Sequence, residues 1–226
     1  MNMKIAVLGT PNRIKELRCI IDSKHELIEV KNKQFVGYDL IIDLEFDNYQ
    51  DRLHDYAHLE GMLIIVGAVK SQLEAQMHQY PHRILCTLIG MNTLPTFINR
   101  SLIELTTVQE EDKAKIYKTI QDLNWEVRWV ESRVGMVTPR IIFMIINEAY
   151  YTLQEGTASR SDIDTGMKLG TAYPMGPFEW CNKVGLKNVY ETLEAVYNDT
   201  KDERYKICPL LKTEYLKERA SYRARA

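Results

Sequence analysis

The turn after the first apolar run holds residues that could contact a nucleotide. Lys4 to Leu8 is typical of a buried strand, and Gly9 follows it. A dinucleotide site needs glycines in such a strand-to-helix turn, so that the backbone can approach the pyrophosphate and the helix can pack on the strand. Pro11 and Ile14 occupy the second and third glycine places, and Pro11 has no N–H to offer a phosphate. The turn therefore predicts weak or absent dinucleotide binding.

A second nucleotide position lies at the end of the next expected strand, Glu26 to Val30. Dinucleotide-binding folds place an acidic residue there for the adenosine ribose. Lys31 holds that place, and Glu29 is expected to point to the other face of the sheet. Lys31 could suit a 2′-phosphate, and the simpler alternative is a solvated strand end.

One pair of histidines has metal-ligand spacing. His54 and His58 lie four residues apart, with Asp51 and Asp55 nearby, so one helical face could carry two ligands. The sequence places no third ligand beside them, and the stretch is polar all round. We therefore expect a solvated face and no metal site.

Composition excludes several classes of protein. The 226 residues carry 29 basic and 31 acidic side chains, a formal charge of −2, so nothing indicates a nucleic-acid surface. No stretch approaches the roughly 18 apolar residues of a membrane span, and the N-terminus lacks the pattern of a signal peptide. The cysteines are widely spaced, which favours reduced thiols and a cytoplasmic location: Cys19, Cys86, Cys181 and Cys208.

The elements that must position these residues fall into two classes. The first half alternates continuous apolar runs with amphipathic stretches, which predicts a doubly wound, Rossmann-like α/β domain with both sheet faces covered. We expect strands at 4–8, 26–30, 38–43, 62–66, 83–88, 102–108 and 126–130, and helices at 12–22, from 44 to 59 and at 110–123.

After residue 131 strand patterns stop and an all-α domain is predicted. Pro139 to Leu153 is apolar on almost every side, which indicates a buried helix with its proline in the first turn. Ser161 to Asp164 resembles a capping box, and Gly170 suits a helix end. Further helices are expected at 186–197 and 210–219. The expected domains are 1–131 and 132–226.

The helical half resembles the C-terminal domain of 3-hydroxyacyl-CoA dehydrogenases, the 3-hydroxybutyryl-CoA type in particular. The resemblance covers about residues 131–216 and is carried, in order, by 135–140, 147–149, 155–156, 162–164, 167–170, 173–177, 185–186 and 209–211. It implies a two-domain protein that uses NAD to oxidise a 3-hydroxyacyl-CoA in fatty-acid metabolism. It also implies a homodimer through the helical domain; an ordinary monomer core is the alternative.

The resemblance also locates a catalytic pair. The family uses a histidine as general base, three residues before an Asn-Pro, and a glutamate that orients it. Ile89 stands in the histidine place, Asn92 is kept as a substrate-binding candidate, and Thr93 replaces the proline. Glu104 matches the glutamate, or is a plain buried carboxylate. An isoleucine cannot accept a proton.

Other polar positions of the family are also changed. Pro139 replaces a substrate-contacting asparagine, Ala68 and Lys70 replace an asparagine and a serine, and Ser71 matches a second serine. The family's helical hairpin, which helps hold acyl-CoA, is expected to be absent, since only 31–34 separate the second strand from Phe35. Two hypotheses remain: an NAD-dependent dehydrogenase with a rearranged site, or a non-catalytic dimeric relative that binds acyl-CoA or a protein partner.

Overall fold

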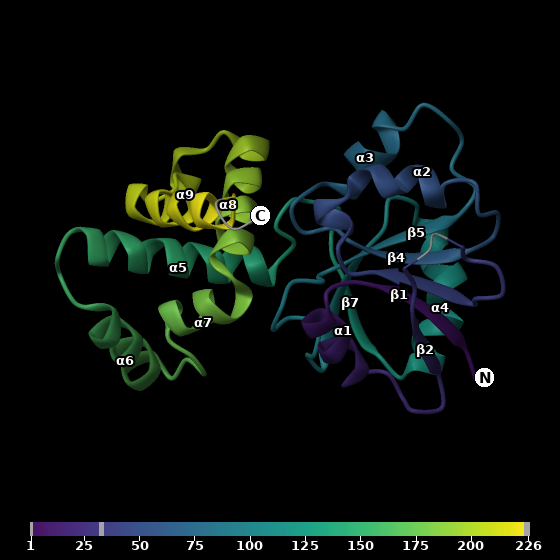
Figure 1. Cartoon of the computed structure of the whole chain (residues 1–226), viewed down its shortest axis with the longest axis horizontal. Coiled ribbons are helices and arrows are strands. Elements are labelled where there is room, and N and C mark those ends of the chain that lie inside the picture. The colour runs from purple at the N-terminus through teal and green to yellow at the C-terminus, as the bar shows by residue number, and fades with distance from the viewer. Residues whose placement is uncertain (1, 32–33, 224–226) are drawn as a thin grey trace. The chain divides into compact units, whose positions relative to one another are not determined.

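A computed structural model describes residues 2–31 and 34–223, and the chain divides into two compact units. The first extends to Met136 and holds the sheet, and the second begins at Val137 and is helical (Figure 1). The expected fold class, a Rossmann-like α/β domain followed by an all-α domain, is confirmed. The domain boundary expected at 131/132 lies a few residues before the division that the contacts make.

The described residues of the N-terminal unit form a seven-stranded sheet in the order β2-β1-β3-β4-β5-β6-β7. β1 to β5 are parallel, β6 is antiparallel to β5, and β7 is parallel to β6. The strands are β1 (Lys4–Leu8), β2 (Glu26–Glu29), β3 (Leu40–Asp43), β4 (Leu63–Gly67), β5 (Thr87–Met91), β6 (Leu102–Thr106) and β7 (Glu126–Trp129). The chain leaves β1 for β2 and returns to β3 on the other side. Ligands of such sheets bind outside the carboxyl ends of the strands at this reversal.

Both faces of the sheet are covered, which explains why the strand sequences are continuously apolar. Successive residues of a strand point to opposite faces. Ile42 and Ile65 belong to one core cluster, whereas Ile41 and Ile64 belong to the other. All four are completely buried.

The helices of this unit depart from expectation where polar side chains intervene. They are α1 (Pro11–Arg18), α2 (Leu53–Tyr56), α3 (Leu73–Gln79) and α4 (Glu110–Leu123), with 3-10 turns η1 (Phe46–Asn48) and η2 (Gln50–Arg52). α4 has the expected bounds. The expected helix from 44 to 59 is instead two 3-10 turns and a short α2, because Asp43, the last residue of β3, accepts from the Glu45 N–H with its side chain and so competes with helical hydrogen bonding there. α1 is shorter than expected, and α3 was not expected.

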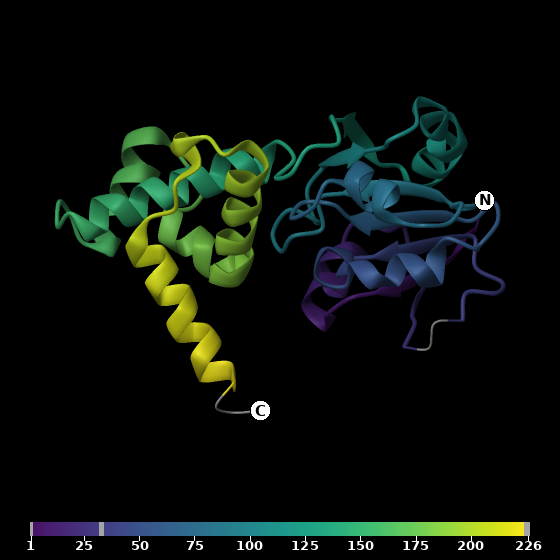
Figure 2. The same ribbon diagram turned by 90° about the horizontal axis from the view of Figure 1, so that it is seen from above.

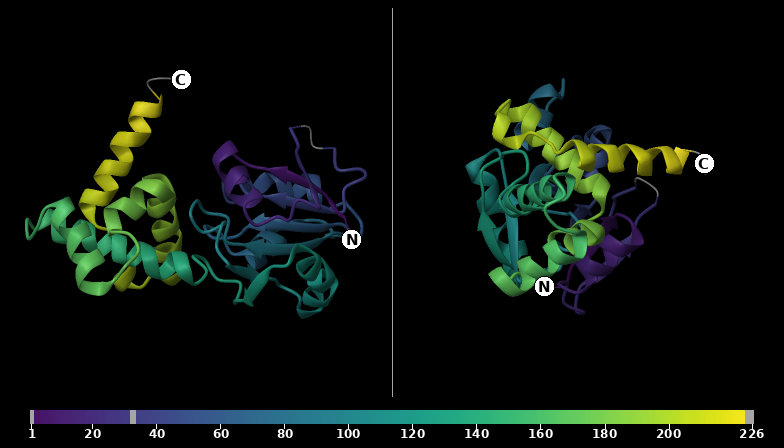
Figure 3. Two further views of the ribbon diagram at one scale, coloured as in Figure 1. Left: turned by 90° about the horizontal axis from the view of Figure 1, so that it is seen from below. Right: turned by 90° about the vertical axis from the view of Figure 1, so that its left-hand side faces the viewer.

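The helical unit consists of α5 (Thr138–Gln154), α6 (Arg160–Thr171), α7 (Pro177–Val184), α8 (Leu186–Thr200), η3 (Glu203–Tyr205) and α9 (Pro209–Arg223). Figures 2 and 3 show α9 extending beyond the other helices of this unit. α6 begins after Ser159, whose Oγ accepts from the Asp162 N–H at 3.3 Å, and not at the expected capping box from Ser161. It ends at Ala172 in the left-handed region, so the expected end at Gly170 is wrong. α7 was not expected.

The segment between β2 and β3 bears on the expected loss of a helical hairpin. No helix is assigned to its described residues, 30, 31 and 34–39, while 32 and 33 lie outside the described part of the chain. In the ranges that the structure describes, no helix is both long and apolar enough to span a bilayer.

Candidate functional site

The reversal of strand order between β1 and β3 is filled by the chain's own side chains. Gly9 follows β1, and a Cβ on it would lie 3.1 Å from Leu44 Cδ1. Leu44 follows β3 and is completely buried. An aliphatic side chain therefore packs against the glycine that a pyrophosphate would need to approach. Pro11 begins α1 and leaves this first turn with one N–H fewer.

A buried ion pair lies in the same turn. Arg13 Nε is 3.2 Å from Glu45 Oε1, and the two side chains are 5% and 11% exposed. Arg13 Nη1 also donates to the carbonyl of Leu44. Arg13 thus joins the first turn of α1 to the loop after β3. Sequence reasoning missed both partners, because no local pattern links an arginine in one turn to a glutamate 32 residues later.

The end of β3 carries a second buried carboxylate, Asp43. It accepts two bonds from Arg52 Nη1, at 2.9 and 3.0 Å, and one from Tyr56 Oη at 2.7 Å. Desolvation by burial, followed by the charge of Asp43, raises the pKa of the Tyr56 hydroxyl. This network holds the loop after β3 in place, and its three side chains hydrogen-bond with one another.

Asp47 connects that loop to the loop after β4. Its carboxylate accepts from the N–H groups of Val69 and Lys70, both at 2.9 Å, and lies 3.5 Å from Ser71 Oγ. Burial raises the pKa of the Asp47 carboxyl above its ordinary value, although these two N–H groups and the charges of Lys70 and Arg13 act in the opposite direction. Ser71, a predicted substrate-binding residue, thus lies beside an internal carboxylate.

The predicted catalytic pair is not assembled. Ile89 lies within β5, is completely buried, and packs in the core cluster that includes Ile65. Glu104 in β6 and Asn92 just after β5 do lie together, since the Asn92 N–H donates to the Glu104 carbonyl at 3.3 Å. They are 8% and 4% exposed. Thr93 is buried, and its Oγ1 has no hydrogen-bond partner among the described residues.

The remaining predicted positions are exposed. Lys31, two residues after β2, is exposed, as is Glu29. His54 and His58 are exposed as well, and the described ranges contain no group of three or more side chains able to hold a metal ion. These residues therefore define no preformed nucleotide or metal site.

In the helical unit, polar residues of the resembling motifs hold helices in place. Asp164 in α6 accepts from the N–H groups of Phe178 at 2.8 Å and Glu179 at 3.1 Å, so it caps the start of α7. A Cβ on Gly176 would overlap the Asp164 carboxyl, which explains the glycine there. Asn147 in α5 accepts from the Cys208 N–H at 2.9 Å, just before α9 begins. These side chains are structural.

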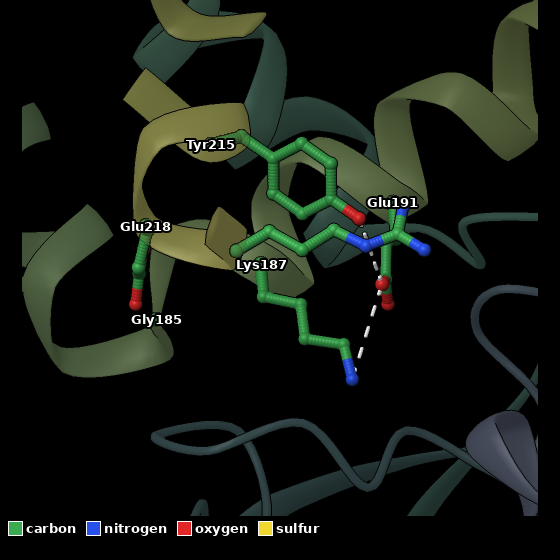
Figure 4. Close-up of a pocket in the computed structure, with 6 residues that line it drawn as sticks. Gly185, Lys187, Glu191, Tyr215 and Glu218 are labelled. Carbon is green, nitrogen blue, oxygen red and sulfur yellow. Dashed lines mark hydrogen bonds and ion pairs between the residues drawn. The ribbon is translucent and has the colours of Figure 1, made fainter. Parts of the chain in front are cut away.

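Two of the hollows on the described surface of the helical unit are lined by its long helices. One, of about 590 Å³, lies between α8 and α9, where Tyr215 Oη donates to Glu191 Oε1 at 3.3 Å and Lys187 Nζ is 3.9 Å from the same oxygen (Figure 4). Its cations, Lys187 and Arg219, are matched by its carboxylates, Glu191 and Glu218, so it favours no ligand charge.

The other hollow is an apolar groove of about 430 Å³ formed by α5, α6 and the first residue of α7. Ile145 and Met167 contribute to its lining. On the same helices, Ile141 and Leu169 are 57% and 83% exposed. The expected burial of α5 is therefore incomplete within one chain, and apolar side chains remain available on this unit.

Comparison with known proteins identifies relatives of this chain. The family model of the 3-hydroxyacyl-CoA dehydrogenase C-terminal domain matches residues 135–225. The chain is 44% identical over 84 residues to 3-hydroxyadipyl-CoA dehydrogenase of Escherichia coli (strain K12), covering 37% of this chain and 18% of the relative. It is 33% identical over 124 residues to 3-hydroxybutyryl-CoA dehydrogenase of Bradyrhizobium diazoefficiens, covering 54% and 41%. The chain thus spans less than half the length of these curated relatives.

Solved structures show the same fold. (S)-3-Hydroxybutyryl-CoA dehydrogenase PaaH1 from Ralstonia eutropha superposes with a TM-score of 0.71, covering 94% of this chain and 93% of that one at 18% identity. A 3-hydroxybutyryl-CoA dehydrogenase from Escherichia coli K12 has a TM-score of 0.59 at 27% identity, covering 70% and 32%. The likeness at 18% identity concerns the fold.

Proposed function

The chain belongs to the 3-hydroxyacyl-CoA dehydrogenase family through its helical domain, and from this premise we propose that it is a dimeric relative that does not transfer hydride. It acts on acyl-CoA metabolism by binding, either to an acyl-CoA or to a protein partner. The observation that carries the proposal is the buried Arg13–Glu45 pair in the turn where the family's cofactor would place its pyrophosphate.

The residues at this turn do not fit NAD. A pyrophosphate carries negative charge and is normally bound by free backbone N–H groups at a helix start. Here Leu44 packs against Gly9, and the Glu45 carboxylate already neutralises Arg13. A second anion at this turn would lie close to the Glu45 carboxylate, and the repulsion between the like charges disfavours it.

Hydride transfer from a hydroxyl also needs a group that accepts its proton. A positioned general base contributes about 10²- to 10⁴-fold to the rate. The matching position holds Ile89, and its side chain is completely buried. The N-terminal unit therefore lacks both a turn suited to the cofactor and a general base at the matching position. This favours binding over catalysis.

The alternative, NAD-dependent oxidation of a 3-hydroxyacyl-CoA, is favoured by one observation. Glu104 and Asn92 lie together near the carboxyl end of β5, as a working site of this family would require. Glu104 would then have to act as the base itself.

Absorbance of NADH separates the two candidates. With NAD and 3-hydroxybutyryl-CoA, the wild-type protein should show negligible turnover. Ile89→His should recover little, because proximity and base act on the same bound complex. Calorimetry should show no low-micromolar binding of NADH. A turnover rate near the ordinary enzyme scale of about 1–10³ per second would overturn the proposal. If Glu104→Gln then abolished this turnover, Glu104 would be identified as the base.

Binding without chemistry is tested with the same substrate. Calorimetry with 3-hydroxybutyryl-CoA, in the absence of NAD, should show saturable heat if an acyl-CoA is the ligand. No heat would exclude that ligand and leave the protein partner as the remaining form of the proposal.

The proposed dimer forms through the helical unit. Support comes from the apolar groove on α5 and α6, and from the exposure of Ile141 and Leu169 beside helices that are otherwise well packed. Contiguous exposed apolar surface is typical of an interaction site.

A further inference from the structure

The sheet of the N-terminal unit ends at β7, a strand with one side available for pairing. Within the described residues β7 pairs with β6 alone and stands last in the strand order. Unpaired strand edges are templates for another strand, and proteins usually protect them with lysines, prolines or bulges. β7 contains neither lysine nor proline.

The backbone groups that face outward can be assigned. The Val130 N–H donates to the Leu105 carbonyl, so Val130 and, by alternation, Arg128 direct their N–H and C=O groups toward β6. Val127 and Trp129 therefore direct theirs outward. The Val127 carbonyl accepts from Arg128 Nη1 at 3.1 Å, an exposed side-chain bond that a backbone N–H of an added strand would replace.

A groove runs beside this edge. It has a volume of about 460 Å³ and lies between α4 and β7, with Tyr117, Val127 and Trp129 among its lining residues. Tyr117 is 60% exposed. Lys113 Nζ lies 5.4 Å from the centre of the Trp129 ring, at one margin of the groove. An added strand would gain backbone bonds from β7 and could fill the groove with its own side chains, as in recognition by strand addition.

We propose that β7 pairs with β7 of a second copy of this chain, antiparallel and centred on Val127. A two-fold axis then passes between the two Val127 residues, which exchange backbone hydrogen bonds and have their Cα atoms about 5.5 Å apart. Both Val127 side chains then lie on the face covered by α4, so each copy helps to fill the groove of the other.

Charge complementarity identifies the second copy as the occupant. In a pairing centred on Val127, Glu126 of each copy lies opposite Arg128 of the other copy. The two resulting charge pairs lie on the face of the sheet away from α4. Within one chain Arg128 Nη2 lies 3.5 Å from Glu126 Oε1, and both side chains are 63% exposed, so each can exchange this surface contact for the opposite charge of the partner. Directly opposite charges on antiparallel strands stabilise by about 0.2–1 kcal/mol per pair, and like charges destabilise. The four-residue strand is thus self-complementary, as a two-fold interface requires.

Site-specific cross-linking tests this arrangement. In a Cys19→Ser background, which removes the exposed native thiol, Val127→Cys should form an intermolecular disulfide on mild oxidation, because the expected Cα separation suits one. The matched control is Val36→Cys, at a 96% exposed valine of the same unit. It should give little cross-linked product under the same conditions.

Charge reversal supplies the second measurement, with folding checked by circular dichroism. Glu126→Arg or Arg128→Glu alone should weaken cross-linking of Val127→Cys, by on the order of tenfold in apparent affinity. The double reversal should restore it, because both cross-strand pairs return. Absence of the Val127 cross-link, equal yields at Val127 and Val36, or failure of the double reversal to rescue would each overturn the proposal. A dimer by light scattering without this cross-link would leave only the helical-unit interface.

Discussion

At the scale of residues, buried charges lie near the carboxyl ends of the strands, where sheets of this topology generally bind ligands. Arg13 and Glu45 neutralise each other beside Gly9, and Asp47 uses the N–H groups of Val69 and Lys70. The first contact joins α1 to the loop after β3, and the second joins η1 to the loop after β4. The same atoms cannot both hold these loops and receive an anion, so stability and ligand binding compete at this edge of the sheet.

Removing one member of the ion pair should be costly. Glu45→Ala leaves the Arg13 guanidinium buried without its counter-charge, and we expect a loss of about 3 kcal/mol in the free energy of unfolding. Urea denaturation measures it. The double variant Arg13→Met/Glu45→Ala, which removes both charges, should recover most of the loss. Equal destabilisation of the single and double variants would contradict this role of the pair.

Asp47 should impose a pH dependence on stability. Its folded-state pKa is raised by burial, so its contribution to stability is fully present below the unfolded value of about 3.9 and is lost as pH rises through the folded pKa. The free energy of unfolding of the wild type, minus that of Asp47→Asn, should therefore fall with rising pH above about 4. Urea titrations of both proteins across pH 4–8 test this, and a difference that grows with pH would refute it.

At the scale of elements, α7 depends on a cap supplied by another helix. Asp164 of α6 bonds the Phe178 and Glu179 N–H groups, and Gly176 leaves room for its carboxyl. Helix starts leave such groups unpaired, and an eight-residue helix has few other bonds to hold it. The stability of the first turn of α7 thus depends on its contact with α6.

Loss of this cap should destabilise the helical unit. Asp164→Ala should lower the free energy of unfolding by about 2 kcal/mol, because two backbone donors lose their acceptor. Thr165→Ala is the control, since Thr165 is exposed on the same helix and its replacement should change stability by no more than about 0.5 kcal/mol. Hydrogen exchange should locate the effect in 177–184. Equal effects of the two substitutions would show that the cap is unimportant.

At the scale of the whole molecule, the apolar surface of the helical unit predicts self-association. Light scattering at micromolar concentration should give at least twice the 26.3 kDa of one chain, and more if the β7 edge also pairs. Leu169→Glu should reduce the mass, because it places a charge on apolar surface that a partner would cover. Val36→Glu, at a similarly exposed position of the other unit, is the control. A monomer at every concentration would contradict both interfaces.

The sequence by itself was sufficient for the fold class, and periodicity explains why. The runs at Lys4–Leu8 and 40–43 are buried on both faces, so apolar character along the strand was enough to find them. α4 was placed correctly because its buried apolar residues, Ile116, Ile120 and Leu123, recur at helical spacing. The resemblance of the helical half likewise rests on ordered local motifs.

The tertiary structure alone decided what the predicted site residues do. Glycine spacing raised doubt about the nucleotide turn, but Leu44 and Glu45, which fill it, belong to another strand's loop. Ser71 and Asp164 were read as parts of motifs, whereas their partners, Asp47 and the start of α7, lie 24 and 14 residues away along the chain. The local sequence pattern predicts burial and secondary structure because both depend on residues that are only a few positions apart. Counter-charges and caps come from segments that only the folded chain brings together.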